Sequence, residues 1–317
     1  MIDKNYISNR LKLLGFSDSV LERYAESHRF YHTITHLLDI ILQLSKLEVF
    51  DDELFLAAVY HDAIYNPQAN DNEEKSAALF IEEAKSTNLT KLQKESIYNL
   101  IIDTKTHKPS NDKSRLLIKA DLNILDQPLG SLIEYEHQIF KEFQFVDYTI
   151  YKPKRIEVLQ SLNVNGKLDS LIEYVNFRKP SIAVFCGSFN PFHKGHFNVL
   201  QKAERIFDKV IISFGKNPDK TNRTWDIPNS IKNRQLTEYN GLLTDFVASL
   251  GYDVVVIKGL RNSTDFQYEQ NQYRYIQELM PKIKIINIFC DKEFEHISSS
   301  GIRTLEKYNK HQSYLLD

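Results

Sequence analysis

The chain has 317 residues, which at the usual size of roughly 100–200 residues per domain predicts two domains. Apolar residues make up 42% of it, enough to form hydrophobic cores, so intrinsic disorder is excluded as the main state. The net charge of −2 gives no broad basic surface, so we expect no nucleic-acid partner. No apolar run reaches the roughly 18 residues of a membrane span, and the first residues lack a signal-peptide core, so we expect a cytoplasmic protein.

Residues 1–178 show the apolar spacing of helices and no convincing strand alternation. The expected helices cover residues 35–47, 52–65, 72–84, about 90–104, about 114–126, about 130–145 and about 151–163. This pattern predicts an all-α domain over 1–178. We expect the linker to the next domain within residues 163–179.

After Pro180 the pattern changes to short apolar runs at 181–186, 210–214, 254–258 and 283–289. Helical segments at about 195–207, 241–251 and 265–279 separate them. Strands that alternate with helices predict a parallel sheet, hence an α/β domain over 179–317. Seven of the ten glycines lie in this second half, which therefore has more positions for tight turns and backbone–ligand contacts. Cys186 and Cys290 lie in apolar runs and are expected to be buried, reduced thiols.

Histidine and aspartate recur in the first half at spacings that suit a metal site. His32 and His36 are four residues apart and share one helical face, while His61 and Asp62 end an apolar helix. Asp121 lies in another apolar helix. Any one of these could be an ordinary helix residue or a helix-end ion pair. Together, imidazole and carboxylate groups suit a divalent cation with open water positions, so we expect His36, His61, Asp62 and Asp121 to bind a metal.

Four neighbouring residues stay open at this stage. His107 is either a further ligand, for a second metal or a substrate phosphate, or a plain loop histidine. Glu73 and Glu74 either line the site or occupy a first helical turn. For Asn72 we favour helix capping, since asparagine before an acidic first turn is a normal helix start.

This set of residues resembles the HD superfamily of metal-dependent phosphohydrolases, over nearly all of residues 1–165. The segments that carry the likeness are Ser27-His28-Arg29-Phe30-Tyr31-His32, His61-Asp62-Ala63-Ile64-Tyr65, Asp71-Asn72-Glu73-Glu74-Lys75-Ser76-Ala77 and Lys119-Ala120-Asp121-Leu122. The resemblance implies an HD-type helical fold and hydrolysis of a nucleotide-like phosphoester. It implies a divalent metal, with Mg, Mn, Fe, Co, Ni and Zn all open. The Tyr-His-x-x-x-His spacing is similar to that of cyclic-nucleotide phosphodiesterases, which implies that His32 protonates the leaving group. The alternative is a nucleotide-sensing or oligomer-building module without hydrolysis.

Residues 182–200 have the order of a phosphate-binding site. A buried strand leads into Gly187 and Ser188, and His193-Lys194-Gly195-His196 opens the next helix. A helix N-terminus offers free N–H groups and positive potential, and glycine lets a phosphate approach the backbone. His193 and His196 lie one turn apart and face the same place.

This segment is similar to the His/Thr-x-Gly-His signature of the nucleotidyltransferase superfamily. Further segments narrow the resemblance to phosphopantetheine adenylyltransferases over about 181–305: Tyr239-Asn240-Gly241-Leu242-Leu243-Thr244-Asp245-Phe246, Ile257-Lys258-Gly259-Leu260-Arg261, Asp265-Phe266-Gln267-Tyr268-Glu269 and His296-Ile297-Ser298-Ser299-Ser300. The resemblance implies a Rossmann-like nucleotidyltransferase domain that joins ATP, bound with Mg, to 4′-phosphopantetheine. The products would be dephospho-coenzyme A and pyrophosphate. It also implies a homo-oligomer, hexameric or trimer-based.

The resemblance assigns roles by position. His196 would contact the α-phosphate, Lys220 would neutralise the phosphoryl group, and Arg261 would bind the nucleotide phosphates. The remaining binding positions are Gly187, Ser188 (acceptor phosphate), Phe189, His193, Gly195, Lys258, Gly259, Glu269 (nucleotide), Ser298, Ser299 and Ser300 (β- and γ-phosphates). The three serines could equally cap the last helix, and Lys220 could be a solvated loop lysine.

Two residues depart from the usual pattern of these enzymes. His193 stands where threonine is usual, and histidine there is more usual in nicotinate-mononucleotide adenylyltransferases. Lys258 replaces an arginine, which weakens a bidentate phosphate contact. The alternative is therefore adenylyl transfer to another acceptor, such as nicotinate mononucleotide.

Overall fold

The computed structural model describes residues 2–216 and 226–317, and the chain divides into two compact units. One unit comprises Met1–Glu142 and Ile156–Asn176 and is called the helical unit here. The other comprises Phe143–Arg155 and Phe177–Asp317 and is called the α/β unit. No helix among the described residues is long and apolar enough to cross a membrane.

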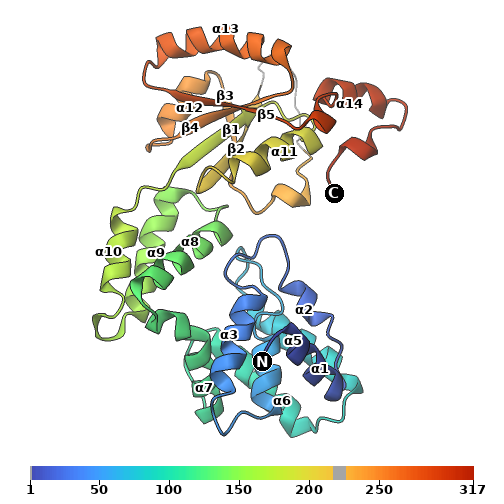
Figure 1. The fold of residues 1–317 in the computed structure, drawn as a ribbon, viewed down its shortest axis with the longest axis vertical. Helices are drawn as coiled ribbons and strands as arrows, with labels where there is room; N and C mark the ends of the chain where they lie inside the picture. Colours follow the sequence, from blue (N-terminus) through green and yellow to red (C-terminus); the bar gives the residue numbers. More distant parts are fainter. Residues whose placement is uncertain (1, 217–225) are drawn as a thin grey trace. The chain divides into compact units, whose positions relative to one another are not determined.

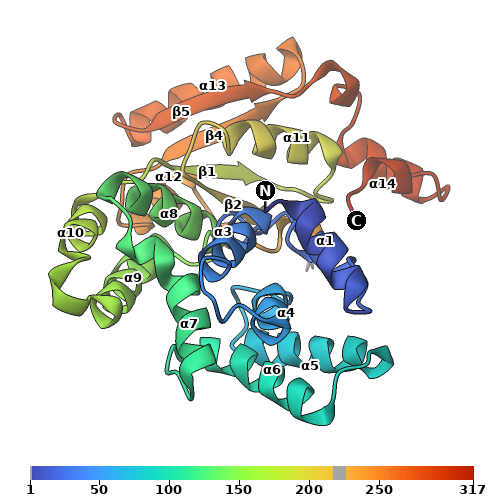
Figure 2. The ribbon, with the colours of Figure 1, turned by 60° about the horizontal axis from the view of Figure 1, so that its bottom comes forward.

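The helical unit is built around α4, whose residues from Leu54 to Tyr60 are all fully buried. Figure 2 shows α4, α5 and α6 side by side. The helices that follow one another along the chain are α1 (Lys4–Leu13), α2 (Val20–Arg23), α3 (Ile34–Leu44), α4 (Asp52–Tyr60), α5 (Asn72–Glu83), α6 (Lys91–Thr104), α7 (Asp112–Asp121), α8 (Leu129–Glu142), α9 (Tyr148–Leu162) and α10 (Asp169–Phe177). Every described strand of the chain lies after residue 181, which confirms the expected helical first half.

Three expectations for this half are wrong in detail. The helix expected over 52–65 ends at Tyr60, so His61 and Asp62 lie in the turn after it. The helix expected over 114–126 is α7 followed by a 3-10 segment, Leu122–Asp126. The expected linker 163–179 contains α10 instead. Leu168, Leu171 and Val175 recur there at helical spacing and are buried in a small second core.

The α/β unit holds a five-stranded parallel sheet in the order β3-β2-β1-β4-β5, which confirms the α/β expectation. The strands are β1 (Ile182–Gly187), β2 (Lys209–Lys216), β3 (Leu236–Asn240), β4 (Val255–Leu260) and β5 (Lys284–Phe289). The helices between and after them are α11 (Lys194–Ala203), α12 (Leu243–Ser249), α13 (Ser263–Leu279) and α14 (Ser299–Glu306). Figure 1 shows α11 and α13 on opposite faces of the sheet. Helix α11 packs against one face of β1 and α12 against the other, which accounts for the continuous apolar sequence of this strand.

Strand β3 was not expected from the sequence, because its residues Leu-Thr-Glu-Tyr-Asn are mostly polar and only partly buried. It forms one edge of the sheet, where a strand is less buried and therefore has fewer apolar residues by which it can be recognised. Both cysteines are buried and free, as expected. The strand order reverses between β1 and β4, and in open parallel sheets the ligand crevice lies at that point, beyond the carboxyl ends of the strands.

Candidate functional site

A cavity of about 590 Å³ lies at the carboxyl ends of β1 and β4. Its walls come from the loop between β1 and α11, the end of β4 and the first turns of α11, α13 and α14. The sequence-predicted residues of this half that line it are Gly187, Ser188, Phe189, His193, Gly195, His196, Lys258, Gly259, Arg261, Glu269, Ser298, Ser299 and Ser300. Lys220 lies outside the described residues. The fold therefore brings segments more than 100 residues apart to one site.

His193 and His196 form a reciprocal cap at the start of α11. The ring of His193 accepts from the backbone N–H of His196, and the Nδ1 of His196 accepts from the N–H of His193, both at 3.4 Å. Their rings stack with centroids 3.6 Å apart. Because each Nδ1 accepts a hydrogen bond, the proton of each neutral ring lies on Nε2. His196 thus has an Nε2–H donor available at the cavity it lines.

Burial keeps both rings neutral. Burial and, to a smaller extent, the charge of Arg261 together lower the pKa of His193 to about 4. The pKa of His196 falls well below its usual value, first through burial and then through His193 and Arg261. At pH 7 the ligand-free pair therefore presents hydrogen-bond donors rather than charges.

Two glycines are needed for the shape of this loop. A Cβ on Gly187 would lie 2.7 Å from the ring of Phe189, which is itself buried and contacts His196. A Cβ on Gly195 would lie 3.2 Å from the His193 ring. The close approach at Gly195 is thus made by a side chain of the signature itself, a reason the sequence did not suggest.

Two cations of the cavity, Lys258 and Arg261, are each paired with a carboxylate. Asp265 Oδ2 accepts from the backbone N–H and Nε of Arg261 at 3.0 and 2.8 Å, and its Oδ1 accepts from Nη2 at 2.8 Å. This pairing raises the pKa of Arg261. Lys258 Nζ lies 3.0 Å from Glu269 Oε2. Sequence reasoning gave Asp265 no role, although a carboxylate four residues after Arg261 was a usable signal for an ion pair.

The start of α14 closes the cavity on another side. Ser298 is its N-cap and accepts from the N–H of Gly301 at 3.1 Å. Ser299 donates to the carbonyl of Pro191 at 3.0 Å, and Arg303 donates to the carbonyl of Asn190. These bonds join α14 to the loop that precedes α11. Arg303, which lines the cavity, was missed because its position in a helical surface pattern looks ordinary.

Comparison with known proteins bears on this unit. A cytidylyltransferase-like family model matches residues 184–305. A phosphopantetheine adenylyltransferase of Mycoplasma capricolum subsp. capricolum is 38% identical over 138 residues, which are 41% of this chain and 99% of that protein. Enzymes of the same name from Cytophaga hutchinsonii and Levilactobacillus brevis are 35% and 33% identical over 40% of this chain, and 91% and 84% of their own length is covered. The chain belongs to the phosphopantetheine adenylyltransferase family. The similarity to phosphopantetheine adenylyltransferases lies in the C-terminal part of the chain, and the helical unit lies outside it.

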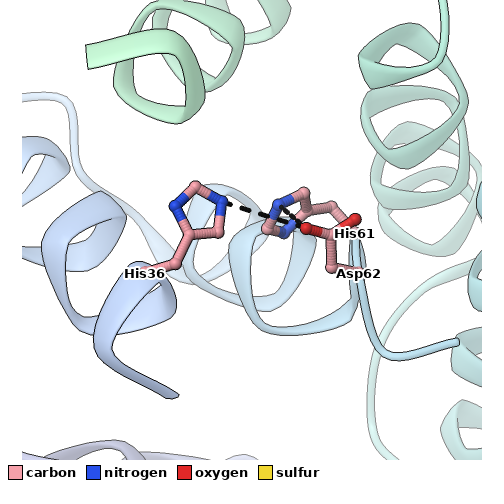
Figure 3. Close-up of side chains that lie close together, drawn as sticks. All are labelled: His36, His61 and Asp62. Atoms are coloured by element: carbon pink, nitrogen blue, oxygen red, sulfur yellow. Dashed lines mark ion pairs between the residues drawn. The ribbon is translucent and has the colours of Figure 1, made fainter. Parts of the chain in front are cut away.

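The helical unit brings the four expected metal ligands together, outside the phosphopantetheine adenylyltransferase match. One ligand atom each from His36, His61 and Asp62 lies within 4.8 Å of the others (Figure 3). Asp121 Oδ1 lies 3.1 Å from His36 Nε2 and 3.6 Å from His61 Nε2. Both histidines are buried and both aspartates largely so, with side chains 15% exposed.

The His61 ring is oriented as a metal ligand would be. Its Nδ1 lies 2.8 Å from the carbonyl of Ala58, which can only accept, so Nδ1 carries the proton. Its buried Nε2 has no hydrogen-bond partner among the described residues, although Asp62 Oδ2 is 3.1 Å away. An imidazole fixed by a carbonyl on one nitrogen, with the other nitrogen open toward carboxylates, fits a divalent cation.

Two neighbouring residues are placed as follows. His107 Nε2 lies 3.7 Å from Asp121 Oδ2, on a backbone with φ of 52°, a left-handed conformation that is uncommon outside glycine. Asn72 is not the cap of α5, so that expectation is wrong. The N-cap is Asp71, and the Asn72 amide exchanges two hydrogen bonds of 3.0 Å with the backbone of Asn66.

A buried carboxylate, Glu142, holds His32 at the edge of this cluster. Glu142 Oε1 accepts from the N–H groups of Phe30, Tyr31 and His32 at 2.7, 2.7 and 3.0 Å. Its Oε2 lies 2.7 Å from His32 Nδ1 and accepts from the Tyr65 hydroxyl at 2.7 Å. Burial would raise the pKa of Glu142, but His32 and these hydrogen bonds lower it to about 2. Glu142 was missed because its partners lie about 110 residues earlier in the chain.

The same contact sets the state of His32. Burial would lower its pKa, but the Glu142 carboxylate outweighs this effect and raises it. The ring stacks on Tyr65 with centroids 4.3 Å apart and lies edge-on to His36 at 5.7 Å. Because Nδ1 is bound to Glu142, Nε2 is the atom of His32 that remains for another partner.

Proposed function

We propose that residues 179–317 transfer the adenylyl group of ATP to 4′-phosphopantetheine, giving dephospho-coenzyme A and pyrophosphate. The observation that carries this proposal is that the signature histidines, Lys258, Arg261 and the serines that open α14 line the same cavity. Family membership supports the same reaction, since the relatives are named phosphopantetheine adenylyltransferases.

The reaction needs no nucleophile from the protein. An oxygen of the acceptor phosphate attacks the α-phosphorus in line, a new P–O bond forms, and the bond to the β-phosphate oxygen breaks as pyrophosphate leaves. His196 Nε2–H can donate to an α-phosphate oxygen as negative charge develops there. The N–H groups at the start of α14 and the guanidinium of Arg261 suit the β- and γ-phosphates. Magnesium carried by ATP would offset the charge of the departing pyrophosphate.

The acceptor is tested by measuring pyrophosphate release with ATP and each candidate in turn. We expect turnover with 4′-phosphopantetheine and little with nicotinate mononucleotide. Turnover with nicotinate mononucleotide alone would contradict the proposed acceptor and leave adenylyl transfer itself intact. It would then favour the alternative that His193 and Lys258 raise.

For residues 1–178 we propose a metal-dependent phosphohydrolase acting on a nucleotide-like phosphoester. The observation that favours it is the buried set of His36, His61, Asp62 and Asp121, with one imidazole nitrogen open toward the carboxylates. A divalent cation there would supply a water of lowered pKa and positive charge opposite the phosphoryl oxygens. His32, held through Nδ1 by Glu142, can donate a proton from Nε2 to the leaving oxygen.

The rival for this unit is a nucleotide-sensing or oligomer-building module without hydrolysis. Calorimetric titration of the whole protein with Mn²⁺ and a phosphatase panel, each on wild type and His61→Ala, distinguish the two. We expect the variant to lose at least 10-fold in Mn²⁺ affinity and most of the hydrolysis. Absence of Mn²⁺ binding, together with no effect of His61→Ala on hydrolysis, would favour the module.

A further inference from the structure

We propose that Arg29 is the positioning residue that fixes the metal-binding turn after α4 against the His32 turn. The inference rests on the proposed phosphohydrolase function and adds to its ligand set a residue that would contact neither metal nor substrate. Its action would pass through three backbone carbonyls.

The Arg29 guanidinium bridges the two turns directly. Its Nη1 donates to the carbonyl of His32 at 3.2 Å and to the carbonyl of Asp62 at 2.8 Å. Its Nη2 donates to the carbonyl of Ala63 at 3.2 Å. One nitrogen therefore joins the backbone of the expected proton donor to that of an expected metal ligand, 30 residues apart in the chain.

The turn after α4 needs such a donor. The helix ends at Tyr60, and carbonyls beyond a helix end have no partner within the helix. In a buried turn they must be satisfied by other groups. Arginine suits this position because its planar fork presents several N–H groups in fixed directions, whereas a lysine ammonium on a flexible stem reaches fewer acceptors with the same geometry.

The charge of Arg29 is compensated by Glu26 and by two tyrosine rings. Its side chain is fully buried, and its Nε donates to Glu26 Oε2 at 3.0 Å. The guanidinium carbon lies 5.2 and 5.3 Å from the ring centroids of Tyr24 and Tyr65, within the range of cation–π attraction. The cation can therefore stay buried without help from a metal-site carboxylate side chain.

The His32 turn is held from two sides as a result. Glu142 accepts hydrogen bonds from the N–H groups of residues 30–32, and Arg29 donates one to the carbonyl of His32. Of these two residues, Arg29 is the one that also donates to the carbonyls of Asp62 and Ala63. Removing its fork should loosen Asp62 as a ligand, in addition to shifting His32.

The test is Arg29→Lys in the full-length protein, with Arg10→Lys as the matched control. Arg10 lies in the same unit, bonds Asp52 and packs over the rings of Phe50 and Phe55, but belongs to no part of the proposed site. Titration calorimetry with Mn²⁺ is expected to show a 10- to 100-fold loss of affinity for Arg29→Lys, about the size of other losses behind a ligand. Arg10→Lys is expected to stay within 2-fold of wild type.

The Mn²⁺ titrations test the metal site and the role of Arg29 separately. Wild-type protein that binds no Mn²⁺ would overturn the proposed metal site itself. Wild-type protein that binds Mn²⁺ no better than Arg29→Lys would overturn the positioning role alone. If circular dichroism shows that Arg29→Lys is unfolded, Glu26→Gln replaces it in the test, because it keeps the guanidinium and weakens only its anchor. We expect a loss of about 3-fold there, and an unchanged affinity would overturn the role of Arg29.

Discussion

The two histidines at the start of α11 show how a residue spacing follows from backbone chemistry. His193 occupies the N-cap and His196 the third helical position, the two places whose side chains can bond each other's N–H groups. Both rings are thereby fixed in one tautomer without any charged partner. The spacing of the signature is thus a capping geometry, in addition to the catalytic role proposed for His196.

Because His193 is buried as a neutral ring, we expect the free energy of unfolding to depend on pH. Its pKa falls from 6.5 to about 4 on folding, so the unfolded chain binds the proton more readily. The stabilisation is fully present above pH 6.5 and is lost as the pH falls toward 4. Between pH 7 and pH 5 this single group should remove about 2 kcal/mol of the free energy of unfolding.

Urea denaturation of wild type and His193→Gln at both pH values measures this contribution. The variant should lose about 2 kcal/mol less than wild type over the same interval. Ionisable groups that do not interact with His193 affect both proteins alike and cancel in the difference. Equal losses in the two proteins would mean that His193 is not buried as a neutral ring.

A second prediction concerns Gly187, which leaves no room for a side chain. In Gly187→Ala the new methyl group would meet the buried Phe189 ring, so we expect about 1–3 kcal/mol of destabilisation and a lower kcat of adenylyl transfer. Gly130→Ala is the control, because a Cβ there meets nothing within 4 Å and the residue lies in α8. It should be neutral or stabilising by up to about 1 kcal/mol. Urea denaturation measures the stability of both variants, and pyrophosphate release measures their kcat. A Gly187→Ala variant as stable and as active as Gly130→Ala would contradict the steric role of Gly187.

At the scale of elements, α14 combines a cap with a proposed phosphate site. Ser298→Ala removes the N-cap and should cost about 1 kcal/mol of stability. Because the proposed β- and γ-phosphates would lie on the same turn, we also expect the KM for ATP to rise several-fold. Steady-state kinetics with varied ATP measure this effect.

The control for Ser298→Ala is Thr90→Ala in the helical unit. Thr90 caps α6 with a full capping box, so its loss should cost a similar free energy. It should leave the KM for ATP unchanged. A KM that rises equally in both variants would show that the effect is general destabilisation.

Elements were predictable from the sequence where burial is continuous or regularly spaced. The apolar runs of β1 and β2 and the helices around α4 follow directly from their sequences. The edge strand β3 did not, because its residues are polar and half-exposed. Helix α10 was expected to be a linker, although Leu171 and Val175 are spaced to face a core.

The sites divide in the same way. The grouping of His36, His61, Asp62 and Asp121 could be predicted, because their side chains suit a site and lie on or beside apolar helices. Glu142 and Arg29 could not, because both act largely on backbone N–H and carbonyl groups far away in the chain. Such partners leave no residue pattern in a single sequence.

At the scale of the whole molecule, one chain carries two arrangements suited to phosphate. The α/β unit offers helix N-termini and glycine-shaped loops, while the helical unit offers buried histidine and aspartate side chains. We predict that the two proposed activities are separable in the full-length protein. His61→Ala should lose hydrolysis and keep adenylyl transfer, because no transfer step uses a residue of the helical unit.

His196→Ala is the reciprocal variant, and it should show the opposite pattern. Both activities are measured on the same preparations, with phosphate release for one and pyrophosphate release for the other. Loss of both activities in either variant would contradict the assignment of one reaction to each unit.

The cavity at the carboxyl ends of β1 and β4 is the proposed site of adenylyl transfer. The most direct measurement is mass-spectrometric detection of dephospho-coenzyme A after the whole protein is incubated with ATP, magnesium and 4′-phosphopantetheine. We expect dephospho-coenzyme A and pyrophosphate in equal amounts from wild type, and at least about 100-fold less of both from His196→Ala, as for loss of an oxyanion donor. Wild-type protein that consumes ATP without forming dephospho-coenzyme A, or a His196→Ala variant as active as wild type, would contradict the proposed transfer.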